Sequence, residues 1–190
     1  MLLLVTALLL APHLATASSS ADSTRTVSGV SLPETIQVEG KTLVLNGMAL
    51  RKKAIFKVYV AGLYVLTKSN GPDPILEADE PRRMVMHFLR NVDKKKICEA
   101  WQDGLEDNTP NPSVEVRKQF DDLCGLMADV KDGQSLVFTY LPDKGTIVEV
   151  AGEEKGVIGS KDFADALLRC WIGPKPGPGE GFKKKLLDVS

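Results

Sequence analysis

Strand-like alternation of apolar and polar residues fills residues 35–66, which read TIQVEG, then KTLVLNG, then AIFKVYVAGLYVLT. The last run is apolar on both faces that a strict alternation generates. One face carries Phe56, Val58, Val60 and Tyr64, and the other carries Ile55, Tyr59, Ala61, Leu63 and Val65. Apolar side chains on both faces are typical of a central strand that is covered on both sides. We therefore expect this run to lie in the middle of a sheet.

Helical spacing of apolar residues appears in three later segments. A helix is predicted from an N-cap at Asp93 to Asn108, a second over residues 113–130, and a third from a cap at Ser160 to a stop at Gly173. Short helices are expected in PILEAD and GFKKKLLD, and strands in residues 82–92 and 134–158. This order, with its tight turns, predicts an α+β fold in which helices cover one face of an antiparallel sheet.

The first seventeen residues contain no Asp, Glu, Lys or Arg, and Leu2–Ala11 form an apolar run of ten residues. As a helix this run rises roughly 15 Å, too short to span a bilayer. The small residues Ala15–Ala17 that follow indicate a secretory signal cleaved before Ser18. No Lys or Arg precedes the run, so a misassigned start codon or an apolar N-terminal helix is the alternative. We predict a signal peptide over 1–17, a flexible lead-in over 18–31, one domain over 32–190, and a periplasmic or extracellular location.

Charge and cysteine content narrow the function classes. The net charge is −1, which gives no electrostatic reason to expect a nucleic-acid partner. Neither CxxC nor a Cys–His cluster is present, and His87 is the only histidine after residue 17, so we expect no metal site and no cofactor. The three cysteines, Cys98, Cys124 and Cys170, are compatible with one disulfide and a free thiol, or with three buried apolar thiols. Membrane contact is expected only through the transient signal peptide.

The stretch LNGMALRKKAIFKVYVAGLYV, Leu45 to Val65, carries the candidate chemistry. Lys57 and Tyr59 are two residues apart on a strand whose same face includes Ile55, Ala61 and Leu63, a combination typical of a cavity wall. Arg51 at the start of this wall would present a fixed fork of donors to a carboxylate or enolate oxygen. The alternative is a salt-bridged surface arginine and a lysine that extends to solvent. Lys52 and Lys53 are expected to be solvated on a turn.

The same segment resembles the chalcone isomerase-like family, particularly its bacterial members that carry signal peptides. Three further stretches are similar in order: MVMHFLRNVDKKKICEAWQDGL, SLVFTYLPDKGTIVEVAGE, and FADALLRCWIGPKP followed by FKKKLL. The resemblance covers nearly all of the chain after about Leu32. It implies an open-faced β-sandwich, a large antiparallel sheet with a helical layer on one face. It also implies either cofactor-free closure of a chalcone, an intramolecular lyase reaction, or the binding of fatty acids, and some family members are not catalytic.

By this resemblance, Arg51 corresponds to the family arginine that stabilises an enolate in the isomerases and holds a carboxylate in the fatty-acid binders. Tyr59 resembles the tyrosine of the fatty-acid binders, whereas the isomerases have a threonine there. The isomerases' helix tyrosine corresponds to Lys95, and their helix asparagine to Gln102 or Asp103. The expected ligand-binding residues are therefore Arg51, Tyr59, Lys57 and Lys95. We expect a small amphipathic acid, or a flavonoid-like ligand, with a bound anion, water or carboxylate beside Arg51. Catalysis by Arg51 and a non-catalytic scaffold are the alternatives.

Overall fold

A computed structural model describes residues 23–189, which form fourteen regular elements. In chain order these are β1 (Thr24–Val27), β2 (Val30–Pro33), β3 (Thr35–Val38), β4 (Lys41–Lys53), β5 (Phe56–Val65), α1 (Pro72–Glu77), β6 (Arg82–Phe88), α2 (Lys94–Asn108), α3 (Val114–Leu126), β7 (Ser135–Leu141), β8 (Gly145–Val150), β9 (Glu153–Ile158), α4 (Lys161–Ile172) and α5 (Glu180–Leu186). The predicted signal peptide lies outside the described residues.

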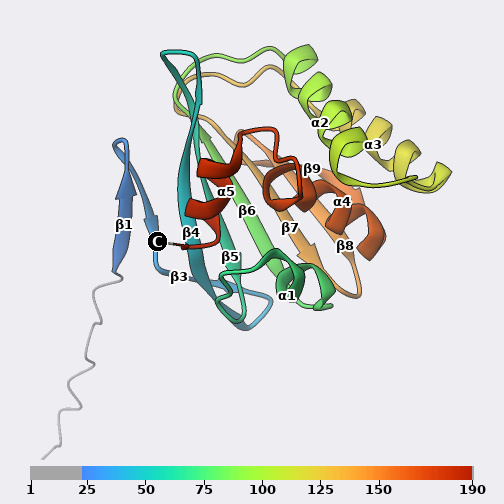
Figure 1. The fold of residues 1–190 in the computed structure, drawn as a ribbon, viewed down its shortest axis with the longest axis horizontal. Coiled ribbons are helices and arrows are strands. Elements are labelled where there is room, and N and C mark those ends of the chain that lie inside the picture. Colours follow the sequence, from blue (N-terminus) through green and yellow to red (C-terminus); the bar gives the residue numbers. More distant parts are fainter. Residues whose placement is uncertain (1–22, 190) are drawn as a thin grey trace, which may run out of the picture.

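The main sheet has seven strands in the order β3-β4-β5-β6-β7-β8-β9, and every neighbouring pair is antiparallel. The sheet curls, and the helices gather on one of its faces (Figure 1). A large apolar core fills the space between them, in which Leu63 and Phe138 from the sheet meet Trp101, Phe163 and Trp171 from the helices. The predicted α+β fold with a helical layer on one sheet face is thus confirmed. No helix within residues 23–189 is both long and apolar enough to cross a membrane.

The opposite face of the sheet is covered in part by the two-stranded hairpin β1–β2. Val30 of this hairpin belongs to a second apolar cluster with Leu45, Val60 and Tyr64 of β4 and β5. The Tyr64 hydroxyl donates a hydrogen bond to the Pro33 carbonyl oxygen at 2.8 Å. The prediction of a flexible lead-in over 18–31 is therefore wrong for residues 24–31. The short alternation of apolar and polar residues on either side of the Ser28–Gly29 turn forms a hairpin because its apolar side chains pack on an apolar face of the sheet.

A β-bulge near the turn of the β4–β5 hairpin decides which side chains reach the helical face. Arg51 pairs with Tyr59, but Lys52 pairs with Lys57, so Val58 has no partner on β4. An extra residue in one strand puts two successive side chains on the same side and reverses the alternation beyond it. Phe56 and Val58 therefore turn toward the helices together with Tyr59, and Lys57 turns away.

Candidate functional site

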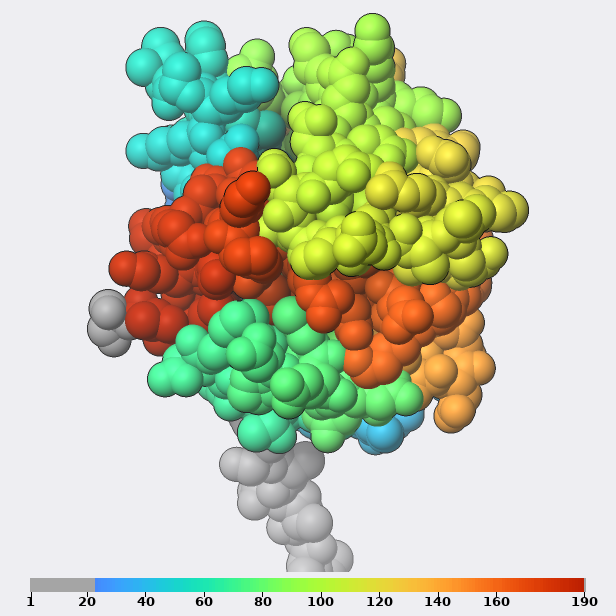
Figure 2. All heavy atoms as spheres, turned by 45° about the vertical axis from the view of Figure 1, so that its right-hand side comes forward, coloured from blue at the N-terminus to red at the C-terminus, as the bar shows by residue number. Residues whose placement is uncertain are grey.

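A cavity of about 660 Å³ lies between the outer ends of β5 and β6 and the helices α2 and α4. This volume is typical of small-molecule sites. Most of its apolar wall consists of Phe56, Val58, Tyr59, Met86, Phe88, Val92, Ile97, Ala100, Trp101, Cys170 and Trp171. Figure 2 shows the β4–β5 hairpin standing apart from α2, with a hollow between the two. The cavity is therefore an apolar compartment with an opening beside the hairpin.

Arg51 and Tyr59 form the polar part of the cavity floor. They are direct cross-strand partners on β4 and β5, and both line the cavity. Side chains of such a pair start only about 5 Å apart, so the guanidinium and the phenol can act on one ligand group. Within residues 23–189 the Arg51 side chain has no ion pair and no hydrogen bond. A bound anion, water or a carboxylate was expected beside Arg51, and no carboxylate of residues 23–189 lies within ion-pair distance of it.

The Tyr59 hydroxyl is held in a defined orientation by α4. Trp171 donates its indole Nε1–H to the Tyr59 oxygen at 3.1 Å. Phe88 and Phe182 pack on the ring of Tyr59, with ring centroids 5.6 and 5.9 Å away. Burial raises the pKa of Tyr59 to about 12, although the Trp171 hydrogen bond and the charge of Arg51 act in the opposite direction. Tyr59 is therefore a neutral phenol at ordinary pH, and its own proton is free to be donated to a ligand.

Charges are distributed unevenly around the cavity. Beside Arg51, the cations Lys53, Arg90 and Lys96 line it near the hairpin and the start of α2. The carboxylates that line it are Glu99, Asp103 and Asp107, which follow one another at a spacing of four along α2. Successive turns of a helix advance 5.4 Å, so the last two carboxylates lie progressively farther from the basic end. An acidic ligand group is thus attracted to the hairpin end and repelled from the far end.

Two of the predicted site lysines lie outside the cavity. Lys57 is exposed because the bulge at Val58 turns it to the other face of β5. Lys95 is exposed over 86% of its side chain and lies 3.8 Å from Glu99, whereas its neighbour Lys96 lines the cavity. Only one side of α2 faces the sheet, and Lys95 lies on the solvent side of the helix.

The predicted apolar lining is also partly wrong. Ile55 is 85% exposed at the hairpin turn, because that turn interrupts the strand before Phe56. Ala61 and Leu63 share the helical face with Tyr59 but belong to the packed core instead of the cavity lining. Of the two positions suggested for the family asparagine, Asp103 lines the cavity, and Gln102 donates a hydrogen bond to Asp121 of α3 at 3.1 Å.

Sequence reasoning missed the contributions of Phe56, Arg90 and Trp171. Arg90 follows the end of β6, and its guanidinium carbon lies 4.8 Å from the ring centroid of Phe56. Arg90 could have been found from the sequence, because it is a cation that closely follows an apolar strand, and this strand ends beside the hairpin of Arg51. Trp171 matched the apolar stripe of its helix, so nothing in the sequence separated its ring nitrogen from ordinary core packing.

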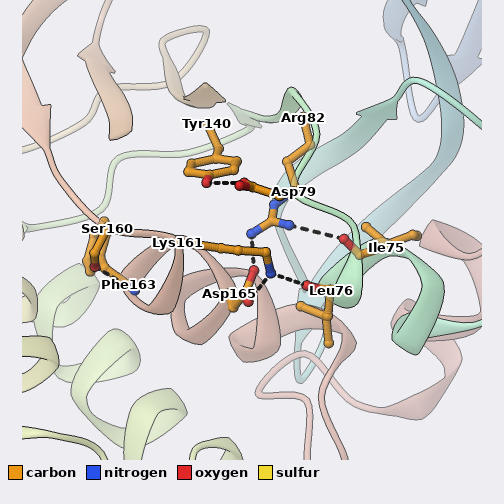
Figure 3. A network of polar contacts seen from close by, with 9 residues as sticks. All are labelled: Ile75, Leu76, Asp79, Arg82, Tyr140, Ser160, Lys161, Phe163 and Asp165. Carbon is orange, nitrogen blue, oxygen red and sulfur yellow. Dashed lines mark hydrogen bonds and ion pairs between the residues drawn. The ribbon is translucent and has the colours of Figure 1, made fainter. Parts of the chain in front are cut away.

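A second polar group of residues lies at the other end of the sheet, where it joins α1, β6 and α4 (Figure 3). The buried Arg82 donates hydrogen bonds to the Ile75 carbonyl oxygen at 3.1 Å and to Asp165. Lys161 donates to the second oxygen of Asp165 at 2.6 Å, and Tyr140 donates to Asp79 at 2.6 Å. The buried Arg82–Asp165 ion pair joins β6 to α4, and both oxygens of Asp165 already have a cationic partner. Within residues 23–189, no group of three His, Cys, Asp or Glu side chains is arranged to hold a metal ion.

The chalcone isomerase-like family model matches residues 24–188, nearly the whole described chain. The chain belongs to the chalcone isomerase-like family. The matched range includes β1 and β2, which is consistent with the hairpin being an integral part of this chalcone isomerase-like domain. No curated protein matches the sequence.

Among solved structures, the chalcone isomerase-like chain is similar to the crystal structure of a fatty-acid binding protein from Arabidopsis thaliana. The TM-score is 0.68 at 17% sequence identity, and the match covers 87% of this chain and 96% of the plant chain. A likeness at this identity establishes the shared fold. It agrees with the open-faced sandwich that the sequence resemblance implied.

Proposed function

We propose that this protein binds a small amphipathic acid, such as a fatty acid, in the cavity between the sheet and α2. The observation that carries the proposal is the Arg51–Tyr59 cross-strand pair at one end of an apolar cavity of about 660 Å³. The guanidinium has no partner among the described residues, and the Tyr59 hydroxyl already accepts from Trp171. Together they offer donors to an acidic head without disrupting an existing interaction.

The bound orientation follows from the charges around the cavity. The acidic head lies beside Arg51 and the Tyr59 hydroxyl, and the apolar tail extends along the apolar wall between β6 and α2. The reverse orientation would place a carboxylate beside Asp103 and Asp107, where like charges repel. Support for a lipid-like acid also comes from the shared fold of the plant fatty-acid binding protein. We further propose that the protein is exported and acts outside the cytoplasm, on the basis of the apolar N-terminal run.

The deciding experiment compares wild type, Arg51→Ala and Lys95→Ala. Small molecules are extracted from each natively purified protein and identified by mass spectrometry, and a fluorescent fatty acid is then titrated into delipidated samples. We expect Arg51→Ala to lose the copurified acid and to bind the probe roughly 10- to 100-fold more weakly, because charge-assisted hydrogen bonds contribute about 1.5–3 kcal/mol. Lys95→Ala removes the same charge outside the cavity, so it is expected to bind like wild type.

Equal probe binding by wild type and Arg51→Ala would overturn the proposal. Enolate stabilisation by Arg51 is the alternative, since the same donors can stabilise an oxyanion. An assay for chalcone closure distinguishes it: a rate above the spontaneous one that disappears in Arg51→Ala favours catalysis. We expect no such rate, because the tyrosine at position 59 resembles that of the fatty-acid binders.

A further inference from the structure

The tip of the β4–β5 hairpin exposes two adjacent large apolar side chains. Ile55 is 85% exposed and Phe56 is 54% exposed, beside the tight turn at Ala54. The other exposed large apolar residues of the described chain are isolated valines: Val114, Val157 and Val189. Single exposed apolar residues are normal, but an adjacent pair at the end of a projecting hairpin suggests a contact surface. The space-filling view shows this tip protruding beside α2 (Figure 2).

The same tip is strongly basic although the whole chain is not. Residues 51–57 read RKKAIFK, with four cations and no carboxylate, in a chain of net charge −1. Lys52, Lys53 and Lys57 form no ion pair with another described residue. Arg90 adds a further cation, because its guanidinium stacks over the Phe56 ring at 4.8 Å. Apolar side chains are therefore surrounded by unneutralised positive charge.

We infer that this hairpin tip docks reversibly on an anionic lipid bilayer. Ile55 and Phe56 enter the boundary between headgroups and acyl chains, while the lysines and Arg90 contact lipid phosphates. An acidic protein partner is less well matched, because a two-residue apolar tip is far smaller than the roughly 800 Å² per partner of a stable protein interface. This surface differs from the membrane contact expected through the signal peptide alone, because it belongs to the folded domain.

The position of the tip gives docking a consequence for the cavity. Phe56 and Lys53 belong both to the tip and to the cavity lining. A docked hairpin therefore brings the basic end of the cavity to the membrane surface, where an acidic lipid can enter between the hairpin and α2. This loading step rests on the proposed function, whereas docking itself requires only the exposed tip.

Flotation with lipid vesicles tests the docking surface. Vesicles of phosphatidylcholine alone are compared with vesicles containing 30% phosphatidylglycerol (about one anionic lipid in three, enough for a strongly negative surface). We expect wild type to float with the anionic vesicles only. The variants Ile55→Ser and Lys52→Gln/Lys57→Gln change tip residues that lie outside the cavity lining, and each should bind at least roughly tenfold more weakly. Val114→Ser, an equally exposed apolar residue at the start of α3, is the matched control and should bind like wild type.

Docking would be overturned if wild type failed to float, if the tip variants floated like wild type, or if Val114→Ser lost as much binding. Circular dichroism establishes that each variant is folded. A second measurement separates docking from ligand binding: the fluorescent acid is presented either in solution or preloaded in anionic vesicles. We expect the tip variants to bind the dissolved acid normally but to take it from vesicles roughly tenfold more slowly. Flotation without any acid binding would refute the proposed function and leave the docking surface in place.

Discussion

The Tyr59 hydroxyl links the strand and the helix that meet at the base of the cavity. It accepts a hydrogen bond from Trp171 at 3.1 Å, and Tyr59 itself is 8% exposed. The bond joins β5 to α4 at the base of the cavity, and it leaves the phenol proton available. Tyr64, five residues along the same strand, has a similar buried hydroxyl on the opposite face of the sheet, bonded to Pro33 at 2.8 Å. Substituting each tyrosine in turn therefore distinguishes an effect on ligand binding from an effect on stability.

We predict that Tyr59→Phe lowers both stability and ligand affinity. The substitution leaves the buried Trp171 N–H without its acceptor, which costs about 1–3 kcal/mol of unfolding free energy. Affinity for the fluorescent acid should fall roughly 10-fold, because the hydrogen bond from the phenol to the carboxylate of the ligand is lost. Urea unfolding and probe titration measure the two effects. Tyr64→Phe should lower stability by a comparable amount without changing affinity, and equal affinity losses in both variants would contradict the assignment.

Individual residues show where sequence reasoning reaches its limit. Arg51 and Tyr59 could be singled out because a cation and a phenol stand out in an apolar strand, and the structure places both in the cavity lining. Lys57 was misplaced because strict alternation cannot anticipate the extra residue at Val58. A single bulge of this kind reverses the facing of every residue beyond it. The ligand roles of Arg51 and Tyr59 stay predictions.

At the scale of the elements, α2 and α4 approach each other closely because Gly104 has no side chain. A Cβ atom at this position would lie 2.7 Å from the Cys170 sulfur and 3.0 Å from its Cβ. The helices themselves were predictable, since Ile97, Trp101 and Leu105 recur at helical spacing and are buried in the structure. Their closeness was not predictable, because a glycine inside a helix reads only as a weak helix former. The β1–β2 hairpin was missed because its stability comes from the sheet beneath it.

We predict that Gly104→Ala destabilises the protein by about 1–3 kcal/mol, as expected when a packed interface must accept an extra methyl group. The cost exceeds the roughly 1 kcal/mol that alanine gains over glycine in a helix. Gly125→Ala in α3 is the control, since a Cβ there meets nothing within 4 Å. It should raise stability by about 0.5–1 kcal/mol. Chemical unfolding of both variants is the measurement, and equal stabilisation by both would show that α2 and α4 are not tightly packed.

At the scale of the whole molecule, the last helix, α5, packs against β4 of the long β4–β5 hairpin. The buried Asn46 side chain donates to the Ser69 carbonyl at 3.0 Å and to the Leu186 carbonyl of α5 at 2.8 Å. A Cβ at Gly47 would lie 2.2 Å from the Lys185 carbonyl oxygen, so α5 contacts the β4 backbone directly. Because α5 also carries Phe182, which packs on Tyr59, this contact connects the end of the chain to the cavity base. Cavity and fold are therefore one cooperative unit.

Buried titratable groups in several parts of the molecule make its stability fall as the pH becomes alkaline. Burial raises the pKa of Tyr59 and of Tyr64 from 10 to about 12, and it also raises the pKa of Tyr140. The thiol pKa of the buried Cys170 rises from 9 to about 12 for the same reason. In each case the folded state keeps a proton that the unfolded chain loses first as the pH rises. The contribution of the thiol to stability is therefore complete below pH 9 and that of the tyrosines below pH 10, and each is lost as the pH rises toward 12.

We predict that the unfolding free energy falls with a slope of up to about 1.4 kcal/mol per pH unit for each such group. Tyrosinate absorbance at 295 nm reports phenol ionisation, which occurs at about pH 10 for a free side chain. In this protein the absorbance should rise only at higher pH, together with the loss of far-ultraviolet circular dichroism. Ionisation near pH 10 with the dichroism intact would contradict the burial of the phenols. Tyr59→Phe removes one of the three phenols from the protein, so its slope should be shallower than that of wild type by about one group's share. A bound acid stabilises the folded state, so it should shift the absorbance rise of wild type to still higher pH and shift that of Tyr59→Phe less, because the variant binds the acid more weakly.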